Sequence, residues 1–136
     1  MDDTSFLAER LDRAAAPLAV GDVLVLLALL TVGTVNHTGV DFLLDDPVYL
    51  LGVWAPFLIG WALFAPLVGA YSAGAVETAK SSVPLAIRSW VPAAVVGFVL
   101  REFAFRGNAA PTFMAITFVL GALALGGWRA IYFRVR

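Results

Sequence analysis

The chain has 136 residues, of which 61% are hydrophobic, and its mean hydropathy is +0.89. A helix crosses a bilayer with about 20 apolar residues, so four such helices and their connections fill nearly the whole chain and leave no room for a soluble domain. The formal net charge of −1 supplies no basic surface for phosphates, which excludes nucleic acid as an expected partner. We therefore expect an all-α, four-transmembrane-helix bundle in the cell membrane, with the lipid bilayer as its surroundings.

Residues 1–16 precede the first apolar stretch and have two faces. Phe6, Leu7 and Leu11 recur at helical spacing, while Glu9 and Arg13 lie on the opposite face. This pattern is typical of a short amphipathic helix on the membrane surface. A solvated tail is the alternative interpretation.

Four apolar stretches predict transmembrane helices at 18–38, 48–74, 83–105 and 112–130. The uncharged core of the third stretch, 89–100, is too short to cross alone, so this span must draw a flanking arginine into the membrane region. Proline removes the hydrogen bond to the carbonyl four residues earlier, so kinks are expected at three prolines within the second and third spans, Pro56, Pro66 and Pro92.

The positive charges predict the orientation. With four spans, one side would hold both termini and the connection between spans two and three, and the other side the two remaining connections. The first side carries Arg10, Arg13, Lys80, Arg88, Arg129, Arg134 and Arg136, and the second carries Arg101 and Arg106. Because cytoplasmic segments are enriched in Lys and Arg, both termini are expected in the cytoplasm.

Small residues four positions apart occur in the last two spans, as Ala93 and Gly97 and as Ala122 and Gly126. Such pairs allow helices to approach closely, although Ala and Gly are also simply common in these helices. Trp90 is expected near a span end, among the interfacial aromatic residues.

Asp22 is the one charge inside the first span. An intramembrane charge costs roughly 2.5 to 3.5 kcal/mol on insertion scales and normally finds a partner in the bundle interior. Arg88 and Arg129 lie near the same ends of spans three and four. We expect an ionic contact between Asp22 and one of them, Arg88 first and Arg129 second.

A second polar layer is predicted near the outer ends of spans one and three. His37 lies about 22 Å along the helix from Asp22, and Arg101 lies about 20 Å from Arg88. Asn36, His37, Arg101 and Glu102 should therefore share one level. Two polar layers around an apolar middle suit a short solute path, and they equally suit two structural clasps.

His37 is the only histidine, and histidine is the side chain whose charge ordinarily changes between about pH 5 and 8. One such ligand per chain makes no closed metal site without a symmetric partner. Neither a metal nor a cofactor is expected, and a hydrogen-bonding role for His37 is favoured.

The chain resembles a family of small four-helix membrane proteins of prokaryotes that is classed as a domain of unknown function. The resemblance covers most of the chain from Asp22 onward. It is carried by Asp22, the segment 33–37, Ala55-Pro56-Phe57 with Gly60 and Trp61, Trp90, Gly97 with Arg101, Phe113, and Gly127-Trp128-Arg129. It implies the four-span topology and its orientation, and it implies no reaction.

Two functions stay open. The first is a small transporter or channel component for a small solute or ion, working as a dimer because four short helices rarely enclose a path alone. The second is a non-catalytic structural or partner-binding membrane subunit, in which the same charges are clasps. A membrane enzyme has the least support, because a single histidine without an evident nucleophile supplies too little chemistry.

Overall fold

The computed structural model describes residues 10–104 and 111–136, and all regular structure within these ranges is helical. Four long helices are each long and apolar enough to cross a membrane, which confirms the expected all-α fold. They are α2 (Ala16–Thr38), α4 (Val48–Val68), α5 (Ala79–Phe103) and α6 (Pro111–Val135). Three short helices join or precede them: η1 (Arg13–Ala15), α3 (Val40–Asp45) and η2 (Ala73–Val76).

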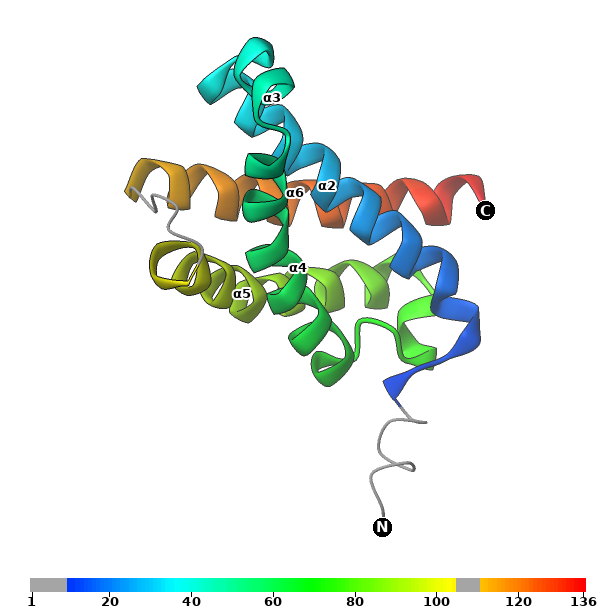
Figure 1. The fold of residues 1–136 in the computed structure, drawn as a ribbon. Helices are drawn as coiled ribbons and strands as arrows, with labels where there is room; N and C mark the ends of the chain where they lie inside the picture. The colour runs from blue at the N-terminus through cyan, green and yellow to red at the C-terminus, as the bar shows by residue number, and fades with distance from the viewer. Residues whose placement is uncertain (1–9, 105–110) are drawn as a thin grey trace.

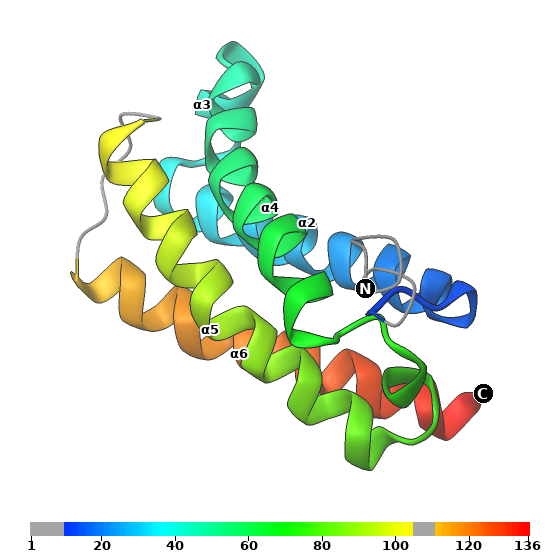
Figure 2. The ribbon, with the colours of Figure 1, turned by 90° about the horizontal axis from the view of Figure 1, so that it is seen from below.

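The four long helices form a ring in which each packs mainly against two others (Figures 1 and 2). Helix α2 packs against α4 and α6, and α5 packs against the same two helices from the other side. Helices α2 and α5 therefore lie on a diagonal of the bundle. This order decides which polar side chains can meet.

The helix bounds differ from the expected spans where local chemistry sets them. Helix α4 ends at Val68 rather than near 74, because Gly69 adopts a positive φ of 103° and its N–H bonds the Ala65 carbonyl. Helix α5 begins at Ala79 rather than 83, capped by the Thr78 hydroxyl. Helix α6 continues to Val135 rather than ending near 130.

Most of the predicted amphipathic segment, residues 1–9, lies outside the described residues. The described part of this segment, residues 10–16, contains η1. Here the Asp12 carboxylate accepts a hydrogen bond from the Ala14 N–H at 2.8 Å. The Asp12 N–H donates to the Tyr71 carbonyl at 2.8 Å. This contact ties the start of the chain to the connection between α4 and α5.

The three prolines at which kinks were expected lie inside long helices, Pro56 and Pro66 in α4 and Pro92 in α5. Each lacks an N–H and interrupts the intrahelical hydrogen bonding, yet both helices continue through them. A kink at these positions stays a prediction.

Aromatic rings and small residues interlock in the core. A Cβ on Gly60 would collide with the Ala93 carbonyl, and one on Gly97 would collide with the Phe57 ring. The expected close approach at Ala93 and Gly97 is thus the contact between α4 and α5. Trp90 is fully buried, and its indole N–H donates to the Phe118 carbonyl at 2.9 Å. Because α5 begins earlier than expected, Trp90 lies mid-helix, and its placement at a span end was wrong.

Candidate functional site

Asp22 and Arg129 form a fully buried ion pair near the end of the bundle where α2 begins and α6 ends. The Arg129 Nη2 bonds Asp22 Oδ2, and Nε lies 3.2 Å from Oδ1. The carboxylate also accepts the Tyr71 hydroxyl and the Trp128 indole N–H, each at 2.8 Å. Four donor atoms from three side chains therefore surround one carboxylate, a charge-assisted arrangement.

The remaining donors of this cluster are also paired. The Arg129 Nη1 lies 3.2 Å from both the carbonyl and the hydroxyl of Ser82 on α5. The Trp61 indole N–H donates to the Tyr71 hydroxyl at 2.7 Å. We call these six residues the Asp22 clasp: Trp61, Tyr71, Asp22, Ser82, Trp128 and Arg129. It joins all four long helices.

Tyr71 lies in the connection after α4, outside the spanning helices. Burial, and then the neighbouring Asp22 carboxylate, raise the pKa of its hydroxyl above the ordinary value. The hydroxyl therefore stays protonated and can donate to Asp22 while it accepts from Trp61.

The partner of Asp22 is Arg129, so the expectation that placed Arg88 first was wrong. Arg88 is exposed on α5, and α5 lies diagonally across the bundle from α2. Helix α6 is adjacent to α2, which brings Arg129 to the carboxylate. Equal depth along two helices does not produce contact when another helix lies between them.

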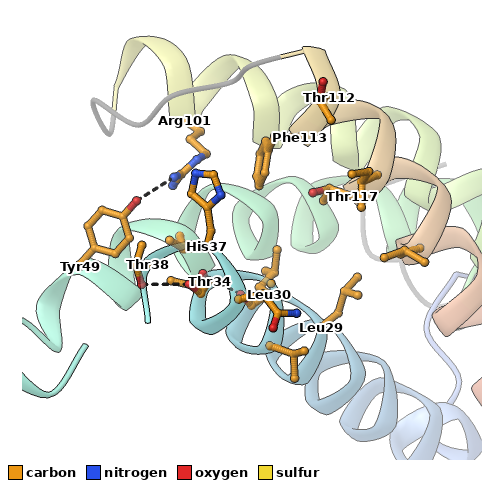
Figure 3. Close-up of a pocket in the computed structure, with 16 residues that line it drawn as sticks. Leu29, Leu30, Thr34, His37, Thr38, Tyr49, Arg101, Thr112, Phe113 and Thr117 are labelled. Atoms are coloured by element: carbon orange, nitrogen blue, oxygen red, sulfur yellow. Dashed lines mark hydrogen bonds between the residues drawn. The ribbon is translucent and has the colours of Figure 1, made fainter. Parts of the chain in front are cut away.

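A cavity of about 520 Å³ lies near the other end of the bundle, between α2 and α6, with α4 and α5 contributing to its walls (Figure 3). Asn36 and His37 line it from α2, Tyr49 from α4 and Arg101 from α5. The structure thus brings together three of the four residues predicted for this layer. Glu102 is exposed and does not line the cavity.

Arg101 is the one charged residue of the cavity wall that is buried, with 7% of its surface exposed. Its Nη2 donates to the Tyr49 hydroxyl at a long 3.3 Å, and its guanidinium carbon lies 5.3 Å from the centre of the Phe113 ring. Among the described residues, its Nε is the only buried side-chain nitrogen or oxygen without a hydrogen-bond partner. Figure 3 shows the His37 side chain directed into the same cavity from α2.

The rest of the cavity wall is mostly apolar or internally bonded. The Thr34 hydroxyl bonds the Leu30 carbonyl of its own helix at 2.7 Å, and the Thr38 hydroxyl bonds the Thr34 carbonyl at 2.9 Å. Across residues 10–104 and 111–136, no three His, Asp or Glu side chains are grouped to hold a metal ion. The chemistry that this cavity offers is a cation in apolar surroundings.

Sequence reasoning did not find Tyr49, Trp61, Tyr71 or Ser82 as members of polar clusters. Hydroxyl and indole groups are common in membrane helices. Only the charged residues could be recognised from the sequence as candidates, because placing a charge in the membrane costs free energy. Tyr71 could have been considered, because a buried tyrosine hydroxyl normally needs a partner.

Residues 19–132 match the model of a family described as a protein of unknown function (DUF3054). The chain belongs to this family. Comparisons with curated proteins and with solved structures gave no match. The matched range includes all residues of the Asp22 clasp and of the Arg101 cavity wall.

Proposed function

We propose that this DUF3054 protein binds a small anionic solute in the Arg101 cavity, as a small transporter or channel component of the cell membrane. The observation that carries the proposal is the buried guanidinium whose Nε has no hydrogen-bond partner. A buried charge without full hydrogen bonding costs free energy. An anion in the cavity would remove that cost.

The second buried arginine of this chain provides the comparison. Every guanidinium nitrogen of Arg129 has a hydrogen-bond partner, and two of them bond the Asp22 carboxylate. Arg101 has one long bond to a neutral hydroxyl and one aromatic ring. The contrast supports a structural role for Arg129 and a ligand-binding role for Arg101.

The size of the cavity also supports binding. Ligand pockets usually measure about 300–1,000 Å³ and combine apolar walls with a few polar groups, and the Arg101 cavity, at about 520 Å³, has this character. A transporting unit would be a dimer, since a four-helix chain offers little enclosed path. With both termini in the cytoplasm, as the Lys and Arg distribution predicts, the cavity would lie in the outer half of the membrane.

The test measures anion-dependent thermal stabilisation of the purified protein in detergent, with a panel of inorganic and carboxylate anions. We expect stabilisation of the wild type that is lost in Arg101→Gln. Arg88→Gln is the matched control, because Arg88 is an exposed arginine on the same helix. Equal stabilisation of all three proteins would sink the proposal.

Uptake into proteoliposomes then separates transport from binding alone. If the solute passes the cavity, His37→Gln and Arg101→Gln should lower the flux of the stabilising anion, while Asp22→Asn should lower stability. Binding without any flux above empty liposomes would remove the transport part of the proposal.

A structural or partner-binding subunit is the second candidate. The Asp22 clasp favours it, because its buried polar atoms all have partners and it joins the four helices. Such a subunit would show neither anion stabilisation nor flux.

A further inference from the structure

Resting on the proposed function, we infer that the ligand of the Arg101 cavity is a single-chain amphiphile with a carboxylate head, a fatty acid, which enters sideways from the bilayer between α2 and α6. Three observations carry this inference: the polarity gradient of the cavity wall, its exposed rim and its single buried cation.

The wall changes from apolar to polar along both helices. On α2 it runs from Leu29, Leu30 and Val32 to Asn36 and His37. On α6 it runs from Leu120 and Ile116 to Thr112, with the buried Thr117 as a polar residue within the apolar part. The stretch from Leu29 to Thr38 covers about 13 Å of helix, and that from Thr112 to Leu120 about 12 Å. Because α2 and α6 run in opposite directions, their polar ends coincide. The cavity is therefore mostly apolar with one strongly polar end, a distribution of polarity that matches an amphiphile.

The apolar part of the rim faces outward. Val32 is 60% exposed, Ile116 53% and Leu120 44%, so in a membrane these side chains would contact lipid chains. A Cβ on Gly33, a residue of α2 that lines the cavity, would meet no atom within 4 Å. At the opposite end of the same two helices, Gly21 packs against the Trp128 ring. The cavity is thus closed by packing at the Asp22 clasp and open to lipid beside Gly33.

The charge of the cavity fits one monoanionic head. Arg101 is the one buried charged residue in the wall, and a guanidinium binds a carboxylate in a planar, bidentate manner. The Tyr49 hydroxyl, which already accepts from Arg101, can turn its own hydrogen toward the second carboxylate oxygen. A cavity of about 520 Å³ whose apolar walls belong mainly to two helices suits one chain rather than two.

The experiment uses the full chain in vesicles of phosphatidylcholine and a dodecanoate that carries a diazirine in its chain. After irradiation, peptide mapping should place the label on the facing walls of α2 and α6. Unlabelled dodecanoate should compete with the label, whereas its uncharged methyl ester should not.

Four variants test the assigned residues. Arg101→Gln should lower labelling about tenfold, as expected for the loss of a charge-assisted bond, and Arg101→Lys should restore part of it. Gly33→Leu should place a side chain at the rim, block entry of the probe and so lower labelling. Gly127→Leu on α6 is its control, because a Cβ there also meets no atom within 4 Å and the residue does not line the cavity. Thermal unfolding of each variant checks that it is folded.

The outcomes separate the two proposals. Labelling of the same walls that is unchanged in Arg101→Gln would mean that ordinary lipid fills the groove, and it would overturn the inference. Competition by propanoate without chain labelling would overturn the fatty acid and leave anion binding in place. Competition by phosphatidylglycerol but not by dodecanoate would overturn the inference that the ligand has a single chain. Absence of both labelling and anion stabilisation would overturn both proposals.

Discussion

Two arginines of this small membrane protein are buried in different ways, and the difference lies in their partners. Arg129 faces a carboxylate and a serine, and its charge is neutralised inside the bundle. Arg101 faces a tyrosine hydroxyl, an aromatic ring and a cavity. Removing one partner from a buried ion pair leaves an uncompensated charge, which is why the two sites should respond differently to substitution.

Asp22→Asn should destabilise the protein by about 3–5 kcal/mol, because it leaves the Arg129 charge buried without a counterion. The measurement is the unfolding free energy in detergent. Asp41→Asn, at an exposed acid of α3, is the control and should change little. In the background of Arg129→Met the effect of Asp22→Asn should be much smaller, and strict additivity of the two substitutions would contradict the contact.

Tyr71→Phe should cost about 1–3 kcal/mol, because the Asp22 carboxylate loses a donor and the Trp61 N–H loses its acceptor. The raised pKa of Tyr71 gives the pH dependence. Its stabilising contribution is fully present below the unfolded-state value, about 10, and is lost as the pH rises beyond it. Stability measured against pH should therefore fall less steeply above pH about 10 in Tyr71→Phe than in the wild type. Tyr132→Phe is the control variant, because it removes a tyrosine hydroxyl outside the Asp22 clasp.

At the scale of the elements, the contact between α4 and α5 depends on residues with a small side chain or none. Gly60 lies against the backbone of Ala93, and a backbone cannot move aside as a flexible side chain can. Close packing of this kind is, with interhelical hydrogen bonds, a source of helix association in a membrane, where apolar burial contributes little.

Gly60→Ala should destabilise the bundle by about 1–3 kcal/mol through overpacking. Gly52→Ala on the same helix should leave stability unchanged or slightly raise it, because a Cβ at Gly52 meets no atom within 4 Å. Thermal unfolding of the two variants in one detergent makes the comparison. Equal unfolding temperatures for the two variants would show that the Gly60 contact is unimportant.

At the scale of the whole molecule, the helix ring places two polar sites at opposite ends of its length. At one end the Asp22 clasp joins α2, α4, α5 and α6, with Arg136 donating to the Val76 carbonyl nearby. At the other end α2 and α6 leave the Arg101 cavity between them. A tightly joined end and a hollow end suit a protein that binds a ligand without losing its fold.

The orientation of this arrangement is the fourth prediction. Both termini should be cytoplasmic, since the positively charged residues concentrate on the side that would hold them. Reporter fusions at the two ends should agree on this location, and a tag inserted in α3 should be accessible from outside. An external C-terminus would contradict the orientation and move the cavity to the inner half of the membrane.

The sequence by itself was enough to predict that the chain lies in a lipid bilayer, that it has four spans and that these carry two polar layers. Apolar stretches of sufficient length need a bilayer, and charges within them need partners, so composition and spacing were enough for these conclusions. Asp22, Asn36, His37, Arg101 and Arg129 could all be singled out in this way. The resemblance to the family also followed from the sequence.

Only the tertiary structure decided which of these residues meet. Depth along a helix is a local property, but the order of helices around the bundle is not, and that order pairs Asp22 with Arg129 rather than Arg88. It also brings His37 and Arg101, from helices on the diagonal, to one cavity, because α2 and α6 pack closely at one end and leave space at the other. Whether a buried charge is neutralised by a carboxylate of the chain or lies incompletely hydrogen-bonded beside a cavity depends on this packing, and neither residue type nor spacing contains that information.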